Sequence, residues 1–207
     1  MTMSHVSTAI RPVEPIERTC PLPTVIDCTL LPRFGVRGRG SCLWLETQGF
    51  PVPDAVNLAK ITDNGILVLR LGQDEAMISC SGAGKSIVNE IETRWAAATG
   101  AKGYDAFRRD GWAHLAIAGA GARELMSEIT EIDLRPSSMP IGRISQSRAL
   151  HMDAVIVRTD RFGEGGYELF FDIASRSYAM EALKGLEPDL AFLSADEFFA
   201  GRMAAVG

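Results

Sequence analysis

The segment with the most unusual chemistry runs from Arg158 to Glu168 and has the sequence RTDRFGEGGYE. Its three glycines allow positive φ angles, and they leave Glu164 free of neighbouring side chains. A carboxylate in such a loop can accept paired N–H groups from a flat heterocycle, as carboxylates do from an arginine fork. The alternative interpretation is a bulged β-hairpin with no ligand.

A second segment that could bind a ligand is Ser81–Ser86, with the sequence SGAGKS. It lies between an expected strand and an expected helix, where a phosphate-binding loop would stand. Such a loop needs a glycine five residues before the glycine of the G-K-S triplet, and this chain has Ser79 there. We therefore expect a strand-to-helix turn, whose free amides could still hold an anion, rather than a nucleotide-hydrolysing loop.

The histidines show no metal-binding pattern. His5, His114 and His151 are far apart, and none belongs to an H-x-x-H or H-E-x-x-H sequence. No G-x-S-x-G sequence marks a nucleophilic serine. We therefore expect no metal site, and we interpret His114 as a half-buried strand residue whose hydrogen bonds are satisfied.

The composition is that of an ordinary globular protein of 207 residues, with 46% hydrophobic and 23% charged residues. Its net charge of −5 disfavours nucleic acid and anionic lipid as partners. The chain has neither a run of roughly 20 apolar residues nor the apolar core of a signal peptide. We therefore expect a cytoplasmic protein with no membrane partner. Its cysteines form no C-x-x-C pair and should be reduced thiols: Cys20, Cys28, Cys42 and Cys80.

The elements that must position these residues indicate an α+β fold, with antiparallel sheets and covering helices. Residues 1–32 contain five prolines and are expected to be an extended arm. Residues 33–207 are expected to form two similar halves, about 33–100 and 101–207. Apolar runs predict strands at Cys42–Glu46, Ile66–Leu71, Glu75–Cys80, Trp112–Ala118, Met152–Thr159 and Tyr167–Asp172. Helical spacing predicts helices over Ser86–Thr99, Ala122–Ile129 and Tyr178–Leu186, and after the capping box Ser194–Glu197.

The segment Arg158–Glu168 resembles the R-T-x-x-x-G-E-x-G-Y/F-E hairpin of the folate-binding aminomethyltransferase superfamily, that of the glycine-cleavage T protein. Upstream, Trp112–Arg123 is similar to the family's strand, glycine turn and helix. In that family the first glutamate of the hairpin contacts the pterin of tetrahydrofolate, and it matches Glu164. The resemblance therefore implies a folate-binding aminomethyltransferase-like fold, with Glu164, Arg158 and Tyr167 as folate-binding residues.

The chain is shorter than a T protein and resembles, from about Leu31 to Leu186, the gamma subunits of heterotetrameric sarcosine oxidases. The matching features include Leu71–Glu75 and Ile132–Arg143. This resemblance implies an accessory subunit with no catalytic residue of its own. Its complex would oxidise the N-methyl group of sarcosine or a similar secondary amine and pass the one-carbon unit to tetrahydrofolate. The alpha, beta and delta subunits would be its partners and would carry FAD, FMN and NAD, because this chain lacks a G-x-G-x-x-G fingerprint.

Such a subunit needs an apolar surface for its partner. The large apolar residues that could form this surface could equally belong to the core: Phe34, Trp44, Phe50, Phe198 and Phe199.

The alternative hypothesis is a free-standing folate-dependent enzyme, in which Glu164 orients the pterin and Asp63 acts on the one-carbon bridge. T proteins carry an acidic pair before a strand at the comparable place, whereas Thr62–Gly65 offers only Asp63. The sequence Asp-Asn-Gly is also strong turn chemistry. Asp63 is therefore expected to be a turn residue, and its catalytic role belongs to the alternative alone.

Overall fold

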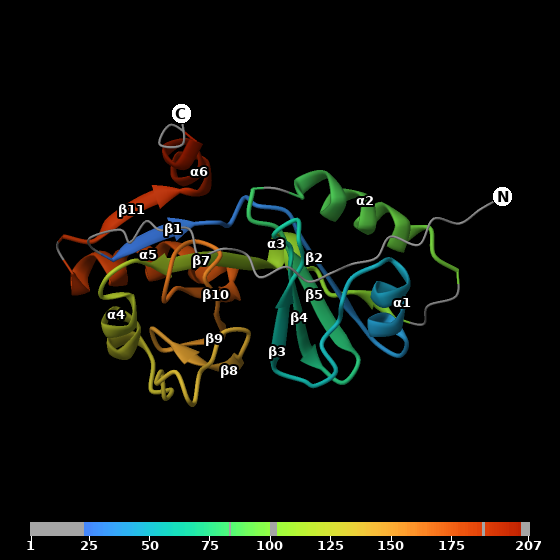
Figure 1. Ribbon diagram of the computed structural model, residues 1–207, viewed down its shortest axis with the longest axis horizontal. Helices are drawn as coiled ribbons and strands as arrows, with labels where there is room; N and C mark the ends of the chain where they lie inside the picture. The colour runs from blue at the N-terminus through green and yellow to red at the C-terminus, as the bar shows by residue number, and fades with distance from the viewer. Residues whose placement is uncertain (1–22, 83, 100–102, 188, 204–207) are drawn as a thin grey trace.

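The computed structural model describes residues 23–82, 84–99, 103–187 and 189–203. These residues form two β-sheets that lie side by side along the long axis of the molecule (Figure 1). The expected antiparallel sheets and covering helices are both present, so the predicted α+β class is confirmed. Among the described residues, no helix has the length and apolar character needed to cross a membrane.

The smaller sheet has five antiparallel strands in the order β3-β4-β5-β2-β6. Its strands are β2 (Arg33–Arg37), β3 (Leu58–Ile61), β4 (Leu67–Gly72), β5 (Glu75–Ser79) and β6 (Tyr104–Asp105). Helices α1 (Ser41–Thr47) and α2 (Lys85–Ala96) pack beside it. The predicted β4–β5 hairpin and the helix that covers it are confirmed.

The predicted strand at Cys42–Glu46 is wrong, because this segment lies within helix α1. Gly40 adopts a left-handed conformation with φ 82 and starts the helix. Cys42 and Leu45 then fall on one buried face at a spacing of three residues. So short an apolar run does not distinguish a strand from a helix, and here the preceding glycine decides.

The larger sheet has six strands in the order β11-β1-β7-β10-β9-β8, antiparallel except for the β1–β11 pair. Its strands are β1 (Thr24–Asp27), β7 (Trp112–Ala118), β8 (Ile144–Ala149), β9 (Met152–Arg158), β10 (Tyr167–Asp172) and β11 (Ala191–Ser194). The remaining helices are α3 (Arg108–Gly111), α4 (Ala122–Ile129), η1 (Ile173–Ser175), α5 (Arg176–Leu186) and α6 (Ala195–Met203). The predicted capping box is confirmed, since Ser194 and Glu197 bond reciprocally at the start of α6.

The N-terminal arm predicted for residues 1–32 needs a correction in its second part. Residues Thr24–Asp27 form β1, which lies between β7 and β11 and is central to the larger sheet. Val25 and Ile26 are fully buried there. The flanking prolines dominated the sequence pattern, but the four residues TVID between them are suited to a strand. Residues 1–22 lie outside the described part of the chain.

The boundary between the two expected halves is also displaced. The smaller sheet ends with β6 at Asp105, and the larger sheet takes β1 from before the smaller one. The chain therefore enters the larger sheet, builds the smaller one, and returns. A division at residue 100 separates neither sheet cleanly.

Three helices begin after the same kind of turn. Helices α1, α2 and α4 each follow a G-x-G sequence whose second glycine, Gly40, Gly84 or Gly121, has a φ of 82, 81 or 79. Because the N-cap residue of each helix is a glycine, it has no side chain to accept from the first turn. Their first-turn N–H groups therefore need other acceptors.

The two sheets share an apolar layer. Leu67, Leu69 and Met77 of the smaller sheet pack against Val157 and Phe170 of the larger one. At the edge, β3 meets the loop before β8, where the Ala59 N–H donates to the Gly142 carbonyl at 2.7 Å.

The substitution Gly142→Ala tests this contact. Gly142 has a φ of +81, and an added Cβ would stand 2.7 Å from the carbonyl oxygen of Ala59. We expect the free energy of unfolding to fall by about 1 to 3 kcal/mol. Gly185→Ala is the control, because a Cβ at this helical position meets nothing within 4 Å. It should raise stability by about 0.5 to 1 kcal/mol. Urea unfolding measures both, and equal changes would contradict the strain at Gly142.

Candidate functional site

The glycine-rich hairpin encloses a buried ion pair between Arg161 and Glu168. The Nε of Arg161 lies 2.9 Å from Oε1 of Glu168, and Nη2 lies 2.5 Å from Oε2. The same carboxylate accepts a hydrogen bond from Thr159 Oγ1 at 2.6 Å and contacts His114 Nε2 at 2.8 Å. The Glu168 side chain is 0% exposed and that of Arg161 is 3% exposed. Both carboxylate oxygens are therefore fully engaged within this chain.

The electrostatics of this cluster keep Glu168 ionised. Burial alone would raise the pKa of Glu168, but the Arg161 charge and hydrogen bonds from His114 and Arg161 outweigh it and hold the pKa below its usual value. Burial lowers the pKa of His114, and the bond to Glu168 offsets only part of this effect. His114 is therefore neutral at pH 7 and donates its Nε2–H to Glu168.

Arg161 also joins the two sheets. Its Nη1 donates to the carbonyl of Gly65 at 2.8 Å, in the turn before β4, and to that of Ser79 at 2.9 Å, at the end of β5. Both carbonyls belong to the smaller sheet or to the turn next to it. One guanidinium thus binds a carboxylate of one sheet and two carbonyls beside the other. The arrangement fixes the position of the hairpin and leaves the carboxylate no free lone pair for acid or base chemistry.

The two acidic residues suggested by the sequence lie at the surface. Glu164 is exposed in the β9–β10 turn, and Asp63 is exposed in the turn before β4. The bond from Arg161 to the Gly65 carbonyl ties these two turns together. Asp63 therefore has the turn position that its sequence predicts.

Arg158 and Tyr167, the other two expected folate-binding residues, do come together. They face each other in the β9–β10 register, and the Arg158 guanidinium carbon is 5.9 Å from the centre of the Tyr167 ring. Both line a hollow of about 180 Å³ together with Gly165, the neighbour of Glu164. Sites that enclose cofactor-sized ligands span about 300 to 1,000 Å³, so the hollow does not fit a whole folate.

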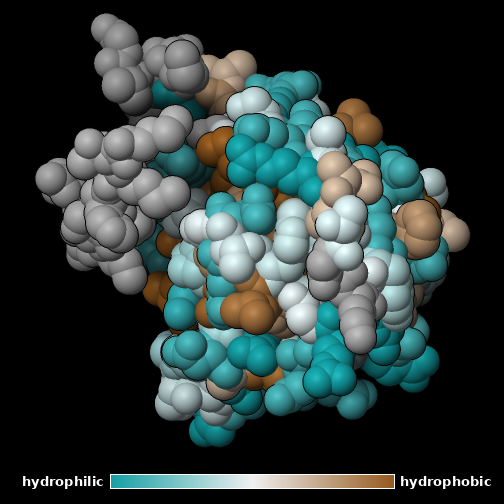
Figure 2. Space-filling model, turned by 90° about the vertical axis from the view of Figure 1, so that its right-hand side faces the viewer, coloured by the Kyte–Doolittle hydropathy of each residue, from teal (hydrophilic) through white to brown (hydrophobic). Residues whose placement is uncertain are grey.

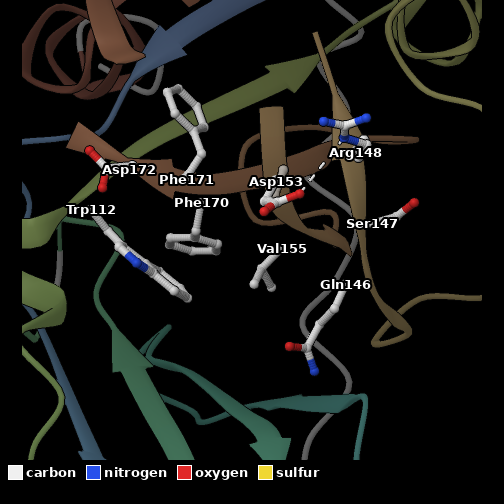
Figure 3. A pocket seen from close by; sticks show the side chains of 10 residues that line it. Trp112, Gln146, Ser147, Arg148, Asp153, Val155, Phe170, Phe171 and Asp172 are labelled. Atoms are coloured by element: carbon white, nitrogen blue, oxygen red, sulfur yellow. Dashed lines mark ion pairs between the residues drawn. The ribbon is translucent and has the colours of Figure 1, made fainter. Parts of the chain in front are cut away.

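A larger pocket of about 520 Å³ lies at the opening of the apolar layer between the sheets (Figure 3). Trp112, Phe170 and Val155 form its apolar part, and none of the expected site residues lines it. Three of its polar residues have partners within the chain. Gln146 donates to the Leu71 carbonyl at 2.6 Å and to Asn57, and Arg148 pairs with Asp153.

The aromatic residues expected at a partner surface lie in the core. Phe34, Phe50 and Phe198 are buried, and Trp44 and Phe199 pack against them. The large apolar side chains that are most exposed are others: Leu30, Leu43, Tyr104, Phe107 and Ile141. On the face seen in Figure 2, hydrophobic side chains show in several separate places among hydrophilic ones.

Sequence reasoning missed the ion pair. Its signal was present, because Glu168 and His114 are polar residues inside strands whose neighbours are apolar. Two such residues in separate strands indicate a buried pairing. The expected strand-to-helix turn at Ser81–Ser86 is confirmed, since β5 ends at Ser79 and α2 begins at Lys85.

The substitution Glu168→Gln tests the buried pair. It leaves the Arg161 charge buried without a counter-ion, and we expect a loss of about 3 to 5 kcal/mol in the free energy of unfolding. The variant should also respond less to acid. The pKa values of Glu168 and His114 are lowered from 4.5 and 6.5, so the unfolded chain binds protons first and stability falls as the pH drops through these values. Without Glu168, the part of this fall below about pH 4.5 disappears.

Urea unfolding between about pH 7.5 and 3 measures both effects. The control is Asp153→Asn, which breaks an ion pair whose side chains are 75% and 100% exposed. It should cost less than about 1 kcal/mol. A Glu168→Gln variant as stable as this control would show that the pair does not hold the hairpin.

Comparisons with known proteins find a matching family and solved structures of similar fold. Residues 58–188 match the family described as the GCVT N-terminal domain. A chain of the heterotetrameric sarcosine oxidase from Corynebacterium sp. U-96 has a TM-score of 0.65 and 18% identity, over 78% of this chain and 81% of that one. The glycine cleavage system aminomethyltransferase T from Bartonella henselae has a TM-score of 0.64 and 15% identity, over 84% of this chain but only 48% of that one.

A search of curated proteins found no match. The two structural similarities establish an aminomethyltransferase-like fold. The family match spans more than half of the 207 residues. This chain therefore belongs to the GCVT N-terminal domain family.

Proposed function

We propose that this chain is an accessory, non-catalytic subunit of a sarcosine oxidase-type complex, corresponding to its gamma subunit. The observation that carries the proposal is the Glu168 carboxylate. It is the one fully buried carboxylate among the described residues, and all its contacts are with Arg161, His114 and Thr159. The acid is thus used to hold the fold together rather than kept free for chemistry.

The extent of the structural similarity supports the same proposal. The sarcosine oxidase chain is covered to 81%, whereas the T protein is covered to 48%. A chain that corresponds to nearly a whole subunit is suited to assembly with other subunits, which would supply what it lacks.

In this proposal the complex is cytoplasmic and oxidises the N-methyl group of a secondary amine such as sarcosine. The alpha, beta and delta subunits would bind FAD, FMN and NAD, and the one-carbon unit would pass to tetrahydrofolate. The contribution of this chain would be a rigid body. Arg161 fixes the two sheets to each other through the carbonyls of Gly65 and Ser79.

Affinity purification of the tagged chain from its native host tests the accessory role. We expect larger chains to copurify, and the eluate to absorb near about 450 nm because a flavin is bound to them. The mass of each chain and the absorbance are recorded on the same eluate. A colourless chain recovered alone would contradict the proposal.

The alternative is that this chain binds folate by itself. The observation in its favour is that Arg158 and Tyr167 line one hollow beside the loop of Glu164. Glu164→Ala tests it by titration of the full-length chain with tetrahydrofolate. The accessory role predicts no effect of this substitution on affinity, whereas the alternative predicts that binding is lost. Glu181→Ala is the matched control, because Glu181 is a glutamate on α5 that is 74% exposed.

A further inference from the structure

We propose that the hollow between the start of α4 and the β9–β10 hairpin binds a small oxyanion, a phosphate or carboxylate group, through Tyr167, Arg158 and the first turn of α4. This inference rests on the hollow itself and does not depend on the accessory role. It concerns a site smaller than a folate, and it does not involve Glu164.

The first turn of α4 supplies a free donor. The helix begins after Gly121 with no side-chain cap. The N–H of Leu125 donates to the Gly121 carbonyl and that of Glu124 to its own carboxylate, but that of Arg123 has no backbone acceptor among the described residues. Such an N–H group, together with the helix dipole, favours an anion at this end.

Tyr167 supplies an independent indication of a ligand. The residue is only 1% exposed, yet its hydroxyl has no hydrogen-bond partner in the part of the chain that the structure describes. The charged groups that act on this hydroxyl are Arg158, Arg123 and Glu124, and all three line the hollow. The hydroxyl therefore faces the hollow. Burial raises the pKa of Tyr167, so the group is a protonated donor at neutral pH.

Arg158 supplies the charge. Its Nη1 donates to the Met139 carbonyl over a long 3.3 Å, and its Nε is buried without a partner. A buried guanidinium nitrogen without a partner, such as Nε of Arg158, is a costly arrangement in an empty protein. An oxyanion compensates for it, because carboxylate and phosphate oxygens accept from a guanidinium fork.

The size and charge of the surroundings agree. A hollow of about 180 Å³ holds a phosphate or a carboxylate with a short substituent. Glu124 is the one acidic residue of its lining, and its carboxylate is paired with Arg123 at 3.1 Å. The adjacent hollow on the other side of the turn is lined by Glu124, Glu128 and Glu187 and by no basic residue. An anion is therefore favoured only on the Arg158 side.

Titration of the full-length ¹⁵N-labelled chain at constant ionic strength tests the proposal. Inorganic phosphate and acetate are added separately, and the amide signals of Arg123, Glu124 and Gly165 are followed. We expect saturable shifts of these signals. The anion that binds more tightly shows whether the natural ligand carries a phosphate or a carboxylate.

Three variants locate the site. Arg158→Gln should weaken binding by about tenfold or more, and Tyr167→Phe by several-fold, since each removes a donor to the anion. Glu124→Gln should tighten binding, because it removes the competing carboxylate. Arg148→Gln is the control, since Arg148 is exposed on β8 and lies outside the hollow.

Two results would overturn the proposal. One is the absence of a saturable shift with either anion. The other is a loss in Arg148→Gln equal to that in Arg158→Gln, with Tyr167→Phe unchanged, because diffuse attraction to surface charge would then explain the shifts. Tyr167→Phe and Glu124→Gln keep the test decisive if Arg158→Gln fails to fold.

Discussion

The structure depends on keeping one buried carboxylate ionised. Removing a charge from water costs several kcal/mol unless a counter-ion and further hydrogen bonds replace the lost solvent. Glu168 receives these from Arg161, His114 and Thr159. Arg161 also donates to the carbonyls of Gly65 and Ser79. The guanidinium that neutralises the carboxylate therefore also sets the distance between the two sheets.

A second buried cation is stabilised differently. Arg33 is 1% exposed and donates to backbone carbonyls rather than to a carboxylate, among them those of Thr29, Arg108 and Arg109. Burial lowers the pKa of Arg33 to about 10, which leaves it charged at neutral pH. Arg33 thus joins the end of the β1–β2 connection to α3, as Arg161 joins the hairpin to the smaller sheet. Two arginines hold the chain where it passes between the sheets.

Elements with a strong local pattern could be predicted from the sequence. Elements whose conformation depends on contacts with distant residues could not. The β4–β5 hairpin, β7 and the capping box at Ser194 follow from alternation, turn chemistry and cap geometry. The helix at Ser41–Thr47 and the strand at Thr24–Asp27 were missed, because a short apolar run has no period of its own and takes its form from its neighbours. For the site, the sequence pointed to the correct hairpin. It could not tell which of its side chains turn inward.

That choice follows from strand alternation. Neighbouring residues of β10 point to opposite faces, so Tyr167 lies in the cluster under α4 while Glu168 meets His114 and Arg161 on the other face. Glu164 stands in the turn, outside the alternation, and points to solvent. One continuous motif thus serves a structural pair, an open hollow and a surface turn. Arg161 supplies the counter-charge of the buried glutamate and bonds both of its carboxylate oxygens, and Thr159 and His114 each bond one of these oxygens as well. Strand alternation therefore turns the glutamate inward, and these three partners together fix its role in holding the hairpin.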